Sequence, residues 1–234
     1  MMSTPYRYAV YFSHAKDSLW WQAGSHWLGR CAASGRAMAQ PDVPLLSSER
    51  MAHLTAEPRR YGWHATLKAP FELAQGHTVS SLLAGMSRLA REFQPFTMPA
   101  MRVRTMGDFL ALRPANEAAA IKDIASSCVT RLHPFARSLS DSELARRRRA
   151  LLTQEEDLLL KNWGYPWVLG AYRFHFTLSG SLSQVDAHEQ HALREAAERH
   201  FHALPDARFD RMSLFAEPSK GADFVLIQEV ELGE

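Results

Sequence analysis

Two short segments, far apart in the chain, share one pattern of residues that could carry out acid–base chemistry. Residues 61–67 read YGWHATL and residues 172–178 read YRFHFTL, so both contain Tyr, an aromatic residue, His, Thr and Leu at the same spacing. Imidazole titrates near neutral pH, so one histidine can take up a proton while another gives one up. The segments therefore predict a site at which His64 and His175 act together.

The bare His-x-Thr pattern is a weak signal in this chain. A third match, His53-Leu54-Thr55, lies beside Glu57 and Pro58 and outside any convincing strand, so we interpret it as a chance match. An isolated histidine would best be read as part of the core. The full seven-residue pattern, at the same place in both halves, favours catalysis by the two histidines over two unrelated core positions.

Strand geometry predicts which side chains accompany the two histidines. Alternate residues of a strand point to opposite faces. The polar face is expected to carry His64, Thr66 and Lys68 in the first copy and Arg173, His175, Thr177 and Ser179 in the second. The opposite, apolar faces are expected to pack against helices. If the two halves pack about a pseudo-dyad, the polar faces meet across a groove.

Such a groove suits displacement at a phosphodiester. One histidine would activate the entering oxygen, and the other would protonate the leaving oxygen. The hydroxyls of Thr66 and Thr177 can hydrogen-bond the non-bridging oxygens, and Lys68 and Arg173 can neutralise the charge that builds up in the transition state. This arrangement requires no metal ion and no other cofactor.

The elements that must position these residues follow one order in both halves. Hydrophobic patterning predicts strands at 6–12, 59–73 and 171–180, and hairpins that join 99–106 to 109–113 and 208–216 to 222–231. Helices are predicted at 17–31, 79–93, 117–132, 140–161 and 186–204. A helix and a hairpin thus follow each histidine-bearing strand. This order predicts an α+β fold with helices packed outside antiparallel sheets.

The composition is that of an ordinary soluble chain. With 234 residues, 46% of them hydrophobic, and no Gly-, Ser- or Pro-rich linker, 1–234 is expected to form a single bilobal domain. The expected lobes are 1–115 and 116–234, with an additional helical segment at 138–168. A net charge of +2 demands neither nucleic acid nor a membrane as partner. The two cysteines lie far apart, and the sequence shows no signal peptide and no long apolar stretch, so a cytoplasmic protein is expected. No obligate protein partner is evident from the sequence.

The paired motifs resemble those of the two-histidine (2H) phosphoesterase superfamily. The longer strings PRRYGWHATLKAPF (58–71) and FHFTLSG (174–180) resemble one bacterial branch of it that is found with phosphonate-utilisation operons. The resemblance implies a bilobal, pseudo-twofold fold with antiparallel sheets lining a central groove. It also implies metal-independent hydrolysis or transesterification of a cyclic or linear phosphodiester of a nucleotide, ribose phosphate or RNA end. By the resemblance, His64 and His175 are catalytic, and Thr66 and Thr177 bind phosphate.

Further substrate-binding residues are expected around this centre: Lys68, Arg173, Tyr61, Tyr165 and Trp167. Tyr61 has an odd offset from His64, which would place it on the apolar face of a regular strand. The aromatic stretch NWGYPWV (162–168) could stack on a base or sugar, or it could fill the gap between the lobes.

Two alternatives to an enzyme stay open. The groove could belong to a non-catalytic binding module for a phosphorylated metabolite or RNA end, although binding alone needs only cations and hydroxyls. The repeat could also be purely architectural, which predicts that the two imidazole rings are buried or far apart.

Other chemical features of the sequence favour simpler interpretations. Arg146 to Arg149 are followed by acidic residues and suggest a solvated, charge-balanced helix rather than a nucleic-acid patch. His188 and His191 have a spacing compatible with metal ligation, but no Cys pair or HExxH pattern accompanies them, so no metal site is expected. The chain also lacks a P-loop, a GxGxxG fingerprint and a GxSxG elbow.

Overall fold

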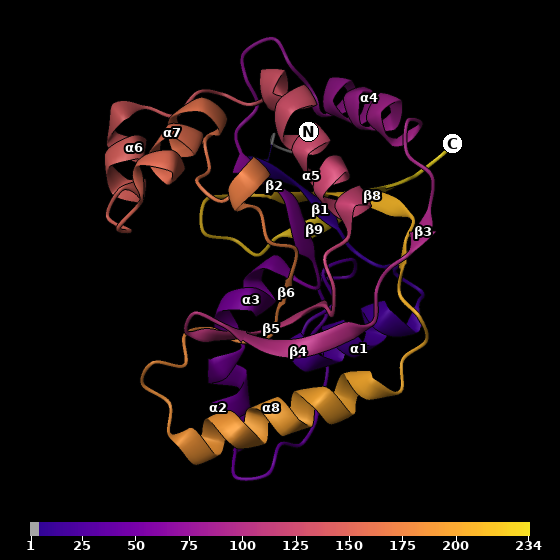
Figure 1. The fold of residues 1–234 in the computed structure, drawn as a ribbon, viewed down its shortest axis with the longest axis vertical. Helices are drawn as coiled ribbons and strands as arrows, with labels where there is room; N and C mark the ends of the chain where they lie inside the picture. Colours follow the sequence, from indigo (N-terminus) through magenta and orange to yellow (C-terminus); the bar gives the residue numbers. More distant parts are fainter. Residues whose placement is uncertain (1–4) are drawn as a thin grey trace.

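Seven strands form one antiparallel sheet through the middle of the protein (Figure 1). The computed structural model describes residues 5–234. The strands of this sheet are β1 (Arg7–Phe12), β2 (Ala65–Phe71), β4 (Met101–Met106), β5 (Phe109–Pro114), β6 (Phe176–Thr177), β8 (Arg211–Glu217) and β9 (Val225–Glu231). Their order is β4-β5-β6-β2-β1-β8-β9, and β3 (Phe96–Thr97) pairs separately with β7 (Arg208–Phe209). Strand β2 and the two-residue strand β6, which contain parts of the two motifs, are therefore neighbours.

Helices cover the sheet on the outside. They are α1 (Leu19–Leu28), α2 (Ser48–Leu54), α3 (Ala56–Tyr61), α4 (Val79–Ala90), α5 (Ala119–Arg131), α6 (Asp141–Arg147), α7 (Gln154–Trp163) and α8 (Ala187–His202). Short 3-10 turns, η1 (His133–Phe135) and η2 (Leu169–Ala171), follow α5 and α7. Figure 1 shows α4 and α5 at one end of the molecule, α1, α2 and α8 at the other, and α6 and α7 projecting at one side. The expected α+β class, with outer helices and an antiparallel sheet, is confirmed.

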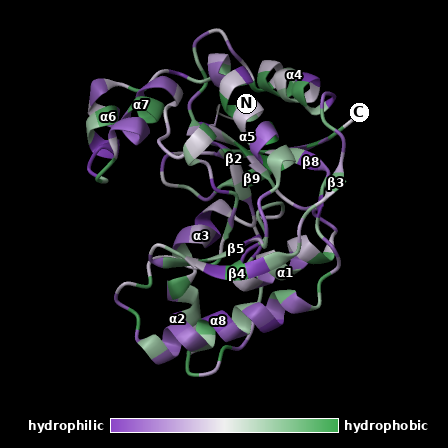
Figure 2. Ribbon diagram, viewed as in Figure 1, coloured by the Kyte–Doolittle hydropathy of each residue, from purple (hydrophilic) through white to green (hydrophobic). Residues whose placement is uncertain are grey.

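The two halves of the chain exchange their helices. Helix α4, from the first half, packs on β8 and β9, whereas α8, from the second half, packs on β4. Both helices have an apolar face for this purpose (Figure 2); in α4 it consists of Leu82, Met86 and Leu89, each at most 1% exposed. The division into lobes 1–115 and 116–234 stays a prediction, and both parts contribute strands to the same sheet.

Three predicted elements differ from the structure. The strand expected at 59–73 is a short helix, α3, followed by β2, because Gly62 ends the helix with a φ of 77°. The helix expected at 140–161 is two helices, because Thr153 and Glu156 form a second capping box that starts α7. The strand expected at 171–180 contributes only residues 176–177 to the sheet. The hairpin at Gly107-Asp108 is present as predicted, with Gly107 at a φ of 57°.

An aromatic cluster supports the motifs from behind. Trp63 and Phe176, one from each motif, are fully buried and stack with ring centroids 4.4 Å apart. Trp63 also fits against Gly24 of α1, where an added Cβ would lie 1.9 Å from the indole ring. This packing fixes the apolar face of the motif strands and leaves their other face for the groove. Among residues 5–234, no helix combines the length and apolar character required to cross a bilayer.

Candidate active site

The two histidines occupy equivalent positions on neighbouring strands. His64 directly precedes β2 and His175 directly precedes β6, and Ala65 lies opposite Phe176 in the antiparallel pair. If this register is continued by one residue in each direction, His64 lies opposite Thr177 and His175 lies opposite Thr66. Side chains opposite each other on such strands are about 5 Å apart at Cβ, and diagonal neighbours about 7–8 Å. Each histidine is thus paired with the threonine of the other motif.

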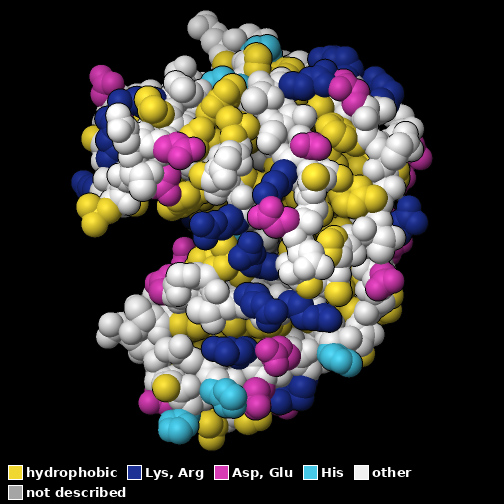
Figure 3. Space-filling view, in the orientation of Figure 1, with side chains coloured by type: hydrophobic (Ala, Val, Ile, Leu, Met, Phe, Trp, Pro, Cys, Tyr) yellow, Lys and Arg dark blue, Asp and Glu magenta, His cyan; other side chains and the backbone are white. Residues whose placement is uncertain are grey.

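All four residues line one groove. It has a volume of about 820 Å³ and is bounded by α3, the β4–β5 turn, the loop after α7 and the motif strands. Figure 3 shows the surface hollowed between the α6–α7 region and the part below it that carries the β4–β5 turn. The two imidazoles therefore share one site, as the paired motifs predict. The alternative in which the rings lie in unrelated places does not agree with this arrangement.

Each imidazole is held by the same backbone contact. Nδ1 of His64 lies 2.8 Å from the carbonyl oxygen of Gly62, and Nδ1 of His175 lies 2.7 Å from that of Arg173. A carbonyl oxygen only accepts, so Nδ1 carries the hydrogen in both rings. In the neutral imidazole the other nitrogen, Nε2, then has the free lone pair. Both histidines are thereby prepared to exchange a proton through Nε2.

Burial favours the neutral form of both histidines. The pKa of His64 is lowered to about 4, chiefly by burial and to a lesser extent by the proximity of His175, although the hydrogen bond to Gly62 raises it. Burial also lowers the pKa of His175, and the positive charge of Arg113 acts in the same direction. An anion placed between the rings would oppose both effects, because an opposite charge stabilises the imidazolium. A bound anion is therefore expected to let one of the two rings hold an additional proton.

Aromatic side chains fix the orientation of the rings. Two tyrosines that line the groove lie close to His64: the ring centroid of Tyr11 on β1 is 4.0 Å from that of His64, and the ring centroid of Tyr61 is 5.9 Å away. Phe109 of β5 lies 5.6 Å from His175. Sequence reasoning missed Tyr11 and Phe109, because both stand in apolar stretches that look like ordinary core strands. Tyr61 belongs to α3, so the strand alternation that placed it on the apolar face does not apply.

The outer residues predicted to bind substrate lie mostly along this groove. Arg173, Tyr165 and Trp167 all line it, and Trp167 is 45% exposed while its Nε1 donates a hydrogen bond to Glu156. The aromatic stretch at the end of α7 therefore lines the groove, and through Trp167 it is also bonded back to α7. An acidic contribution from Glu57, Asp108 and Glu156 was not predicted, because these carboxylates lie outside the two motifs.

The facing predicted for Lys68 is wrong. Thr66 pairs with Tyr11 and Lys68 pairs with Val10. Val10 and Tyr11 are consecutive in β1, so Leu67 is an extra residue in β2 that has no partner in β1. Such a bulge reverses the alternation beyond it. Lys68 is consequently only 4% exposed and does not line the groove; its Nζ donates to the carbonyl oxygen of Val129 in α5.

The histidine spacing on α8 leads to no cluster. His188 and His191 are exposed, and His191 lies near Glu195 of the same helix. Within residues 5–234, no three His, Cys, Asp or Glu side chains are grouped so that they could hold a metal ion.

Comparisons with known proteins give a family and several relatives. Residues 66–225 match the family described as "Protein of unknown function (DUF1045)". A protein of Janthinobacterium sp. (strain Marseille), named ribose 1,5-bisphosphate phosphokinase PhnN, is 40% identical over 227 residues, or 96% of this chain and 50% of that protein. A protein of the same name from Laribacter hongkongensis (strain HLHK9) is 38% identical over 97% of this chain and 52% of its own length. The chain thus spans about half the length of these curated relatives.

The solved structures that align with this chain have much lower sequence identity than these relatives. One described as a phosphoesterase has 11% sequence identity and a TM-score of 0.40, covering 98% of this chain and 100% of that one. E. coli LigT, solved in complex with NADP+, has 12% identity and a TM-score of 0.40, covering 99% of this chain and all of LigT. LigT complexed with 3'-AMP aligns similarly, with 10% identity and a TM-score of 0.41, over 98% of this chain and 99% of LigT.

Proposed function

We propose that this chain, which belongs to the family described as "Protein of unknown function (DUF1045)", cleaves a phosphodiester with His64 and His175 as general acid and base. One observation carries this proposal. Two imidazoles with the same Nδ1 contact face one groove, each opposite the threonine of the other motif. This arrangement supplies two proton-transfer groups and two hydroxyl donors around a single centre.

The reaction follows from the positions of these groups. Nε2 of one histidine removes a proton from water while the water oxygen forms a bond to phosphorus. The bond from phosphorus to the leaving oxygen breaks, and the other histidine protonates that oxygen through Nε2. Thr66 and Thr177 donate hydrogen bonds to the non-bridging oxygens, where charge accumulates. The products are a phosphomonoester and an alcohol, and the two histidines exchange protonation states.

The substrate class is suggested by the names of the curated relatives. Those proteins are named for a kinase acting on ribose 1,5-bisphosphate and are about twice as long as the part that this chain matches. This chain contains no P-loop sequence, so we assign it no kinase role. A phosphodiesterase that supplied such a kinase would open a cyclic phosphate at C1 of ribose 5-phosphate, adding water across one P–O bond. We therefore propose a phosphorylated ribose with a cyclic phosphodiester as substrate; phosphonate metabolism stays a prediction.

The test uses single substitutions and a matched control. His64→Ala and His175→Ala are assayed against ribose cyclic phosphates, 2′,3′-cyclic nucleotides and an RNA with a cyclic end. Each change is expected to lower kcat by about 10²–10⁴, the usual contribution of a general acid or base. His53→Ala is the control, because His53 belongs to the third His-x-Thr match but is exposed on α2 and does not line the groove.

Two outcomes would contradict the proposal. Turnover that survives in both His64→Ala and His175→Ala would remove the histidines from the chemistry. Tight binding of these ligands by the wild type without any turnover would instead support a binding module. Wild-type turnover is expected to persist in EDTA, because the proton transfers proposed here use only side chains of this chain.

A further inference from the structure

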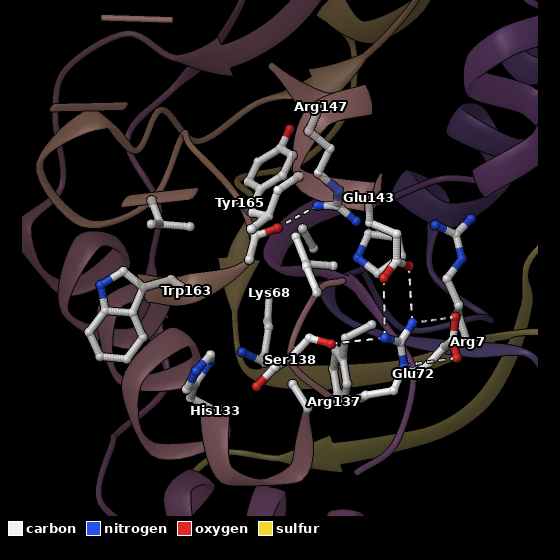
Figure 4. Close-up of a pocket in the computed structure, with 18 of the residues that line it drawn as sticks. Arg7, Lys68, Glu72, His133, Arg137, Ser138, Glu143, Arg147, Trp163 and Tyr165 are labelled. Carbon is white, nitrogen blue, oxygen red and sulfur yellow. Dashed lines mark hydrogen bonds and ion pairs between the residues drawn. The ribbon is translucent and has the colours of Figure 1, made fainter. Parts of the chain in front are cut away.

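A second, smaller cavity lies beside the groove. Its volume is about 110 Å³, and Ala69, Pro70, Tyr165 and Val168 line both the cavity and the groove. A space of this size suits a small anion or a few water molecules rather than a whole metabolite. Figure 4 shows Lys68, His133 and Arg147 around it, with the ion pairs of Arg137 at its edge.

Lys68 brings a buried positive charge into this cavity. It is 4% exposed, and among residues 5–234 no carboxylate forms an ion pair with it. Its one hydrogen bond runs from Nζ to the carbonyl oxygen of Val129, at 3.3 Å, so two of the three ammonium donors stay available. Burial lowers its pKa to about 8. A buried lysine without a counterion is unusual, and a bound anion would supply one.

His133 adds an unsatisfied polar atom at the same place. Its Nδ1 is buried and has no hydrogen-bond partner among the described residues, and Trp163 packs edge-on against its ring at 5.1 Å. His133 and Lys68 line the same cavity, and burial, together with the charge of Lys68, lowers the pKa of His133. A buried nitrogen without a partner normally indicates a ligand or water that satisfies it.

The charge around the cavity is predominantly positive. Its lining contains six Lys and Arg side chains and two carboxylates, Glu72 and Glu143, while Arg7 and Lys161 pair with carboxylates outside the lining. Glu72 and Glu143 both form ion pairs with Arg137. Arg147 donates to the carbonyl oxygen of Gly164, and burial together with the neighbouring charges of Arg7 and Arg146 lowers its pKa. The arginine run at 146–149 is therefore only partly a solvated face, since Arg148 pairs with Asp157 while Arg146 and Arg147 line the cavity.

We propose that this cavity is a binding site for a phosphate dianion, held by Lys68, His133 and Arg147. Three buried or half-buried donors from β2, the turn after α5 and α6 converge on one small space. Phosphate offers the acceptor oxygens that these donors lack, and arginine and lysine both bind it well. The dianion is either a second phosphate of the substrate or free phosphate, and only the former case rests on the proposed function.

The first experiment measures binding and does not depend on turnover. Inorganic phosphate is titrated by calorimetry into the wild type, Lys68→Met and the double variant His64→Ala/His175→Ala, which removes the imidazoles of the groove. The double variant is expected to keep binding phosphate in the cavity. Lys68→Met is expected to weaken phosphate binding in the cavity about 10- to 100-fold, the range for a hydrogen bond to a charged group. Arg147→Gln should weaken it similarly, whereas Lys16→Met, at an exposed lysine outside both cavities, should not.

A second arm distinguishes the two sources of the dianion. Wild type and Lys68→Met are compared on a ribose cyclic phosphate with and without a 5-phosphate. A KM that rises at least tenfold only for the phosphorylated substrate identifies the substrate's own phosphate. An equal KM change for both substrates, with free phosphate binding lost, identifies a site for free phosphate.

The outcome that overturns the proposal is clear from the titration. If folded Lys68→Met binds phosphate as tightly as the wild type, or the double variant binds none, the cavity is not a phosphate site. Either result leaves the proposed function untouched, because that function is judged by the single histidine variants.

Discussion

Replacing Lys68 by methionine is expected to stabilise the protein at neutral pH. Burial lowers the pKa of Lys68 from 10.5 to about 8, which corresponds to a free energy of about 3 kcal/mol against the charged form in the folded state. Methionine has a similar length and no charge, but it gives up the hydrogen bond to Val129, which contributes about 1 kcal/mol. The net gain is about 2 kcal/mol, or about 4–8 °C in Tm for a chain of this size.

The pH dependence of this gain identifies its cause. Below about pH 8 the lysine is protonated in both the folded and the unfolded state, so the folded protein bears the full desolvation penalty. Between about pH 8 and 10.5 the unfolded chain binds more protons, and the stability of the wild type rises with pH. The advantage of Lys68→Met should therefore be greatest at pH 7 and vanish near pH 10, where the remaining desolvation penalty equals the free energy of the lost hydrogen bond.

The assay is urea denaturation of both proteins at pH 7 and at pH 10, in a buffer without phosphate, so that no anion compensates the lysine. Comparing the two proteins at each pH cancels the contribution of every other titrating group. A difference in unfolding free energy that is the same at both pH values, or a loss of stability at pH 7, would refute the reasoning. Added phosphate should stabilise the wild type and reduce the difference at pH 7.

The histidines, the threonines and the turn before β2 can be tested separately. As the pH falls from about 6.5 towards 4, the unfolded chain takes up a proton that folded His64 does not, so stability falls; denaturation of His64→Gln should show a smaller fall. Thr66→Val and Thr177→Val should each lower kcat/KM about tenfold, whereas Thr130→Val, whose hydroxyl bonds within α5, should leave it unchanged. Gly62→Ala should destabilise by about 1–3 kcal/mol more than Gly76→Ala, since both have positive φ but only Gly62 would clash, with Ala32; equal Tm losses would exclude the clash.

The sequence was sufficient to predict the centre of the site. The alternation of polar and apolar residues is local information, so it correctly grouped each histidine with its threonine. The repeat then indicated that the two groups belong together, and the structure places both in one groove. The capping box of Ser140 and Glu143 and the Gly107-Asp108 turn are equally local signals, and they predicted where α6 begins and where the β4–β5 hairpin turns.

The features that the sequence did not reveal depend on distant partners. The bulge at Leu67 arises from pairing with β1, which is separated from β2 by three helices, and nothing within 65–71 indicates it. That one residue moved Lys68 from the expected groove to the small cavity. Tyr11 was missed for the same reason, because its place beside His64 exists only after β1 and β2 pair.

The position of β1 in the middle of the sheet affects how the protein can be made. β1 is hydrogen-bonded to β2 on one edge and to β8 on the other, so its two partners leave the ribosome at very different times. Until β8 has been synthesised, a nascent chain carries an apolar strand with one unpaired edge, a form open to wrong pairing. Chains released early are expected to aggregate or to need a chaperone rather than to persist as stable, partly folded proteins.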